Sequence, residues 1–167
     1  MIRPKPHFVP VGNALDTLYT AINLGVMPAW ALLVFAPRWH VTRALVHSFL
    51  YPFIYGGIYA ALLISALFFG QDAEGAGMST IEGVSALFSA PTGVLTGWTH
   101  YLIFDLFVGA WISRDSIHRT IPHLLIIPVL IFTLIFGPVG LFLYGLIRLV
   151  KKPGDLALAA GRKTQDH

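Results

Sequence analysis

Charged residues are scarce in this sequence. Asp, Glu, Lys and Arg make up 11% of its 167 residues, whereas a soluble globular domain carries about 25%. So few charges do not cover a water-exposed surface, and the composition therefore excludes a soluble enzyme, a nucleic-acid-binding domain and a disordered chain. Cysteine is absent, which excludes a disulfide framework and thiolate chemistry.

Four long segments are almost free of charge. Asp, Glu, Lys and Arg are missing from 17–37, 44–71 and 120–147, and 83–113 contains a single charged residue, Asp105. A membrane-spanning helix needs about 20 apolar residues, more than a core helix of a soluble protein usually has. The sequence therefore predicts an all-α integral membrane bundle of four transmembrane helices. They are expected near 13–35, 44–69, 92–113 and 122–150.

A short interfacial helix is expected before the third span. Ser79-Thr80-Ile81-Glu82 has the pattern of a capping box, in which a hydroxyl and a carboxylate three residues later satisfy free N–H groups at a helix start. Pro91 would end this helix, which we place at 80–90 on the membrane surface. Residues 1–154 would then form a single domain, and 155–167 a mobile tail.

The fourth helix is longer than one membrane crossing requires. Its 28 uncharged residues would extend about 42 Å, against a hydrocarbon core of about 30 Å. Pro128 and the sequence Gly137-Pro138-Val139-Gly140 interrupt it. We expect either a tilted, kinked helix or one that is discontinuous near its middle. Broken helices at that depth often line binding sites, because their free backbone groups need partners.

Four spans would place both termini on one side of the membrane. That side would carry seven Lys and Arg residues and the opposite side four, so the positive-inside rule favours cytoplasmic termini. The loop 71–91 on the same side carries only acidic charges, which favours the reverse. About a dozen residues precede the first expected helix, too few for an organelle transit peptide, and we therefore expect a bacterial inner-membrane protein.

Asp105 is the strongest single candidate for a functional residue. It would lie about 12 Å inside the end of the third helix. A carboxylate at that depth is costly unless it is paired or hydrated, and such residues face the bundle interior. We therefore expect the Asp105 carboxylate to reach a side chain of another helix, either as a functional group or as a structural partner. Tyr101 lies four residues earlier on the same helix face.

More polar side chains are expected at the end of the bundle opposite the termini. They are Arg43, His47, Asp115, Arg119 and His123. Pro122 would start the fourth helix, so that His123 lies in its first turn and approaches Asp105 or Asp115. Such a set of carboxylates, histidines and arginines can form an acid/base site or an interfacial network of ion pairs. No His-x3-His pair is present, and we expect no metal site.

Two sets of aromatic and polar residues in the first half of the chain have helical spacing. The second helix carries His47, Tyr51, Tyr55 and Tyr59 at intervals of four. Such a stripe can stack along a flat, extended ligand or can pack against neighbouring helices. The first helix carries Asp16, Tyr19, Thr20 and Asn23 on one face. We expect Tyr144 and Arg148 to be the partners of that second set.

The second half of the chain carries motifs that resemble a known family. They are the segment 81–91, Gly97-Trp98-Thr99-His100-Tyr101, Asp105-Leu106-Phe107-Val108-Gly109, Trp111, Asp115, Pro122-His123 and Gly137-Pro138-Val139-Gly140. This pattern resembles the abscisic acid-deficient-four family, the plant neoxanthin-synthase-related membrane proteins and their bacterial relatives. In plants that family is linked to opening of the violaxanthin epoxide, which gives the allenic xanthophyll neoxanthin.

The resemblance implies that this chain binds or converts a carotenoid or a similar polyene. The matched residues His100, Asp105, Asp115 and His123 are the implied catalytic candidates. Epoxide-to-allene isomerisation needs an acid at the epoxide oxygen and a base that removes a proton from the chain. Asp105 and His123 would supply them, without cofactor or metal. The expected ligand-binding residues are Trp98, Tyr101, Trp111, Tyr51, Tyr55, Arg43, His47 and Arg119.

A second function competes with the enzyme. The same aromatic residues would suit a non-catalytic pigment- or lipid-binding subunit of an oligomer or a larger membrane assembly. Membrane lipids are expected partners in either case, and nucleic acid in neither.

Overall fold

The computed structural model describes residues 11–69 and 75–150. Every regular element in these ranges is helical, which confirms the all-α prediction. The helices are α1 (Val11–Phe35), α2 (His40–Leu45), α3 (Leu50–Phe69), α4 (Ile81–Leu87), α5 (Pro91–His118), α6 (His123–Phe136) and α7 (Pro138–Val150). The tail expected at 155–167 lies outside the described residues.

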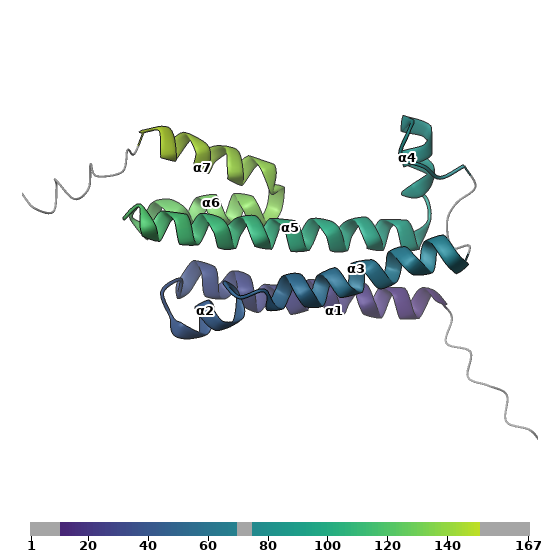
Figure 1. Ribbon diagram of the computed structural model, residues 1–167, viewed down its shortest axis with the longest axis horizontal. Coiled ribbons are helices and arrows are strands. Elements are labelled where there is room, and N and C mark those ends of the chain that lie inside the picture. The colour runs from purple at the N-terminus through teal and green to yellow at the C-terminus, as the bar shows by residue number, and fades with distance from the viewer. Residues whose placement is uncertain (1–10, 70–74, 151–167) are drawn as a thin grey trace, which may run out of the picture.

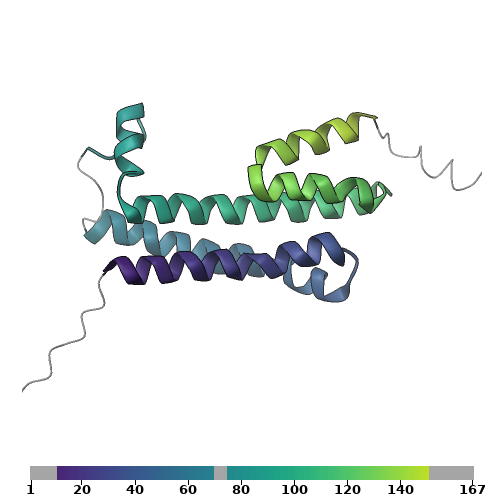
Figure 2. The same ribbon diagram turned by 180° about the vertical axis from the view of Figure 1, so that it is seen from behind.

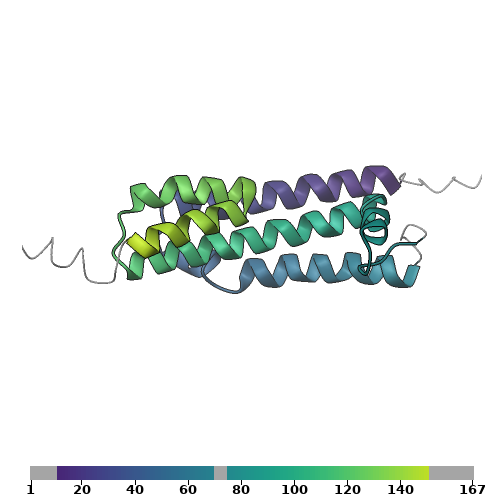
Figure 3. The same ribbon diagram turned by 90° about the horizontal axis from the view of Figure 1, so that it is seen from above.

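The long helix α5 is the centre of the molecule. It packs against α1 and α3 on one side and against α6 and α7 on the other (Figure 1). The three long helices α1, α3 and α5 run side by side along the long axis of the molecule (Figure 3). Gly109 allows part of this packing, because a Cβ atom at that position would lie 2.7 Å from the Trp30 ring of α1.

The structure does not confirm the predicted bundle of four membrane-spanning helices. Among the described helices, two segments are long and apolar enough to cross a membrane, 14–35 and 40–68. The expected third span is part of α5, which extends to His118 and so includes residues 114–118 that were expected in a loop. The expected fourth span is divided into the two shorter helices α6 and α7.

The predicted second span contains a break that the sequence analysis missed. Residues 46–49 separate α2 from α3. The Ser48 hydroxyl accepts a hydrogen bond of 3.3 Å from the Leu50 N–H, as capping residues do at a helix start. Pro52 falls in the first turn of α3, where its missing N–H leaves no bond unmade. These two residues favour a new helix at Leu50 over continuation from α2.

The predicted fourth span is a helical hairpin rather than one tilted helix. The chain reverses at Gly137, whose φ is +27°, and α7 returns along α6 (Figures 1 and 2). Pro138 begins α7 because its ring cannot donate the hydrogen bond that would continue α6. A Cβ atom at Gly140 would overlap Thr133 of α6, so glycine is needed where the two helices cross. The discontinuity was predicted, but the reversal was not.

The hairpin also determines where the last described helix ends. Val11 begins α1 at one end of the bundle, and Val150 completes α7 at the other end (Figure 2). The expectation that both termini share one side rested on four full crossings. In the described chain, the start of α1 and the end of α7 lie at opposite ends of the bundle because α7 returns along α6.

The short helix α4 is separate from α5, as predicted, and projects away from the long axis (Figure 1). Its cap lies one residue later than expected. The Thr80 hydroxyl, rather than that of Ser79, accepts a hydrogen bond of 3.0 Å from the Gly83 N–H. Pro91 is the first residue of α5, a position that proline favours.

Candidate functional site

An apolar groove of about 540 Å³ lies between α3 and α5. It is lined by Phe49, Pro52, Gly56, Tyr59, His100, Ile103, Phe104 and Phe107. Residues at positions 100, 104 and 107 share one helix face by their spacing. The His100 ring stacks on Phe104 at a centroid distance of 4.5 Å and lies 5.5 Å from the Tyr59 ring. The groove therefore has a largely aromatic lining, and its two polar groups are the Tyr59 hydroxyl and the His100 imidazole.

The groove continues toward the end of the bundle that contains α2. A smaller cavity of about 170 Å³ shares Phe49, Pro52 and Phe107 with the groove. This cavity also borders His47, Trp111 and Arg114. Shared lining residues make the two hollows neighbours, and the lining changes from aromatic to basic along them.

A third hollow of about 510 Å³ completes the row. Its lining residues are Pro37, Arg38, Arg43, His47, Arg114, Ile117 and His118, and we call it the basic pocket. It shares His47 and Arg114 with the smaller cavity. Arg43 and His47 thus lie together at this end, as the sequence predicted, but they face Arg114 rather than Asp115.

Asp105 points into the bundle, as predicted, and is 8% exposed. A Cβ atom at Gly137 would overlap its carboxylate, so Asp105 lies against the turn between α6 and α7. Its Oδ2 atom is buried without a hydrogen-bond partner among the described residues. The neighbouring Tyr101 hydroxyl donates to the Ile135 carbonyl at 2.7 Å. Among the described residues, the expected side-chain partner of Asp105 Oδ2 from another helix is not found.

The structure separates the two residues that were expected to act as acid and base. The His123 Nε2–H donates to the Val34 carbonyl of α1 at 2.8 Å. His123 begins α6, whereas Asp105 contacts Gly137 just beyond the end of that helix. The length of α6, about 20 Å, lies between them. The structure therefore does not bring these two residues together at one site.

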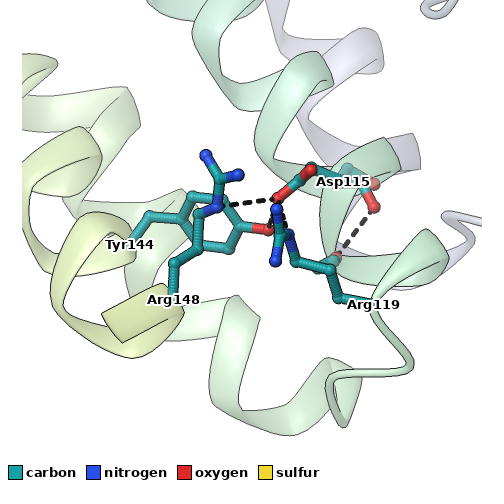
Figure 4. Close-up of polar contacts among 6 residues, drawn as sticks. Asp115, Arg119, Tyr144 and Arg148 are labelled. Carbon is teal, nitrogen blue, oxygen red and sulfur yellow. Dashed lines mark hydrogen bonds and ion pairs between the residues drawn. The ribbon is translucent and has the colours of Figure 1, made fainter. Parts of the chain in front are cut away.

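Asp115 is the centre of a polar cluster that joins α5 to α7 (Figure 4). Its Oδ2 atom accepts hydrogen bonds from the Tyr144 hydroxyl at 2.6 Å and from Arg119 Nε at 2.8 Å. Arg148 Nε lies 3.3 Å from the same oxygen. The Arg148 guanidinium also lies over the Trp111 ring at 5.4 Å. We call these five residues the Asp115 cluster.

The contacts of the Asp115 cluster affect the charge state of Asp115. Burial alone would raise the pKa of Asp115, but the hydrogen bonds from Tyr144 and Arg119 and the positive charges of Arg148 and Arg119 together lower it. An ionised carboxylate with these donors is an ion-pair centre rather than a proton donor. The expected pairing of Tyr144 and Arg148 with the Asp16 face of α1 is wrong, because the hairpin returns α7 to the opposite end.

Several predicted ligand-binding residues connect helices. Tyr55 and Tyr51 donate hydrogen bonds to backbone carbonyls of α1, at 2.7 Å to Ile22 and 3.3 Å to Gly25. Trp98 Nε1–H donates to the Asn23 side chain at 3.0 Å. The tyrosine stripe thus divides, because its first two rings pack against α1 and Tyr59 lines the groove.

The sequence did not predict three lining residues of the basic pocket, namely Arg38, Arg114 and His118. Arg114 and His118 share a helix face only because α5 continues past residue 113. A loop was expected there, so their i,i+4 spacing was overlooked. Among the described residues, no three His, Asp or Glu side chains converge as a metal site would require.

One comparison with known proteins gives a match. The model of the ABA DEFICIENT 4-like family matches residues 17–144, a range that includes the groove, Asp105 and most of the α6–α7 hairpin. No curated protein and no solved structure matches the chain significantly.

Proposed function

Because the chain belongs to the ABA DEFICIENT 4-like family, we propose that it binds a carotenoid or a similar polyene in the groove between α3 and α5. The observation that carries this proposal is the aromatic lining of that groove, from Phe49 to His100. A polyene is long, flat and apolar, and aromatic rings stack well on such a ligand. Ligand sites of this kind are mostly apolar with a few polar groups that fix orientation.

A membrane location supports a ligand of this kind. Two segments have the length and composition of membrane spans. Large apolar side chains on the outer surface are strongly exposed, among them Phe53 at 77%, Phe68 at 77% and Leu124 at 79%. Such surfaces require cover, which lipid chains would provide. A lipid-dissolved polyene would then enter the groove from the side.

We further propose that His100 and Tyr59 carry the chemistry if the polyene is converted. Isomerisation of an epoxide to an allene breaks a C–O bond, adds a proton at the oxygen and removes one from the chain, so the composition of the molecule is unchanged. The Tyr59 hydroxyl would donate to the epoxide oxygen, and the His100 imidazole would take the chain proton. This assignment replaces Asp105 and His123, which do not border the groove.

The groove proposal is tested by filling the groove from Gly56. A Cβ atom at Gly56 meets nothing within 4 Å, and the same is true of the neighbouring Gly57, which does not line the groove. In cells that make epoxy-carotenoids, Gly56→Phe should lower the polyene retained per protein at least about fivefold, as overpacking by 1–3 kcal/mol implies. The polyene is measured by visible absorption and chromatography after extraction in mild detergent.

Gly57→Phe is the matched control for that measurement. It adds the same side chain to the same helix and should retain the polyene like the wild type. Equal retention by both variants, or loss from both, would contradict binding in this groove.

His100→Phe distinguishes an enzyme from a binding subunit. Phenylalanine preserves stacking on Phe104 but removes the proton-accepting nitrogen. If His100 is the base, conversion of a bound epoxy-carotenoid should fall about 10²- to 10⁴-fold, with little change in retention. Unchanged product formation would remove His100 from the reaction. If neither the wild type nor the variant forms product, a non-catalytic pigment-binding subunit is the better assignment.

A further inference from the structure

The basic pocket contains positive charge without a counter-charge. Arg38, Arg43 and Arg114 line it, and no acidic side chain does. Within the described parts of the chain, none of these three guanidinium groups forms an ion pair. Like charges that gather at one hollow repel each other, so the arrangement favours a bound anion.

The contrast with the Asp115 cluster strengthens this inference. The other two described arginines, Arg119 and Arg148, both lie within ion-pair distance of Asp115. Asp115 of α5 thus neutralises arginines only a short distance along the same helix from Arg114. The basic pocket instead leaves its arginines open to an external ligand.

His47 adds a directed polar group to the same place. Both of its ring nitrogens are buried without a hydrogen-bond partner among the residues described here, although the Pro37 carbonyl lies beside the ring. His47 and Arg114 line the wall that the basic pocket shares with the smaller cavity.

We propose that the basic pocket binds the phosphate group of an anionic ligand. Guanidinium groups match phosphate oxygens in geometry and charge, because each presents several N–H donors in one plane. The pocket volume of about 510 Å³ has room for a phosphate with a substituent. This site is separate from the polyene groove and does not depend on the function proposed for that groove.

The surroundings favour a lipid headgroup as the source of the phosphate. Phe35 is 84% exposed, Trp39 49% and Phe49 74%, and they neighbour residues of the pocket in the sequence. Exposed aromatic residues beside arginines are typical of the membrane interface, where basic groups attract anionic lipids. A soluble phosphate would use the same donors but none of this apolar surface.

The test uses the full chain in a neutral detergent, with binding followed by native mass spectrometry. The probes are phosphatidic acid, oleate and inorganic phosphate. The wild type should retain phosphatidic acid, and Arg43→Gln combined with Arg114→Gln should weaken this binding at least about tenfold. Arg43→Lys combined with Arg114→Lys is the matched control, because it preserves the charge and should retain more binding than the glutamine pair.

Each outcome bears on the proposal. Binding of phosphatidic acid but not of inorganic phosphate identifies a headgroup site, and binding of inorganic phosphate with equal dependence on the two arginines identifies a site for soluble phosphate. Equal binding of oleate would overturn the assignment of phosphate. Undiminished binding of phosphatidic acid by the glutamine pair would overturn the pocket itself, provided that thermal unfolding without lipid matches the wild type.

Discussion

Replacing Gly137 with alanine is expected to lower the free energy of unfolding by about 2–4 kcal/mol. Its φ of +27° is unfavourable for a residue with a side chain. The added Cβ atom would also overlap the buried Asp105 carboxylate. Thermal or denaturant unfolding in one fixed detergent measures the loss.

Gly145→Ala is the control for this substitution. Gly145 lies in α7, and a Cβ atom there meets nothing within 4 Å. Alanine at that position should be neutral or stabilise by up to about 1 kcal/mol. Combining Gly137→Ala with Asp105→Ala should recover part of the loss if the carboxylate overlap contributes to it. Wild-type stability of Gly137→Ala alone would show that the chain does not reverse at Gly137.

Removing the carboxylate of Asp115 is the second change with a large expected effect. Asp115→Ala leaves Tyr144, Arg119 and Arg148 without their common acceptor. Breaking a fully buried pair costs about 3–5 kcal/mol, and partial exposure of this cluster should reduce the loss to about 2 kcal/mol. Protease cleavage of α7 should become faster, because α7 loses its polar contact with α5.

Tyr144→Phe provides a graded comparison. It removes one hydrogen bond but retains the ring that meets Trp111 at 5.5 Å, so a loss of about 1 kcal/mol is expected. If Asp115→Ala and Tyr144→Phe both unfold like the wild type, the Asp115 cluster does not secure the hairpin.

The same cluster gives stability a defined pH dependence. The pKa of Asp115 is lowered in the folded protein, so its contribution is fully present above the unfolded-state value of about 3.9. The contribution is lost as the pH falls through the folded pKa, because the protonated carboxyl no longer holds the two arginines. The Asp115→Ala protein should lose less stability than the wild type over that acid range.

Local sequence signals predicted the elements of the fold but not their path. The boundary of α1 at Phe35, the separate helix α4 and the break at Gly137 follow from proline, glycine and capping residues nearby. The direction of α7 after the break depends on contacts distant in sequence, namely Gly137 with Asp105 and Tyr144 with Asp115. A glycine-proline pair predicts that a helix ends, but it does not predict the direction of the next helix.

The candidate site was predicted in part for a related reason. His100 and Asp105 belong to one motif, and we expected both at the same site. Five residues correspond to a rotation of about 140° on a helix, so His100 faces α3 while Asp105 faces the turn after α6. His100 and Asp105 are therefore close in sequence but lie in different environments. The helical spacing of the tyrosine stripe, by contrast, correctly indicated that one face of the second span is aromatic.

The returning hairpin gathers the arginines of the described chain at one end of the bundle. All five described arginines gather at the end where α7 finishes, whereas the acidic residues Asp16 and Glu82 lie toward the end where α1 begins. From the positive-inside rule, we propose that this arginine-rich end of the described chain faces the cytoplasm. Glu82 of α4, one of the acidic residues that conflicted with cytoplasmic termini, lies at the end opposite these arginines.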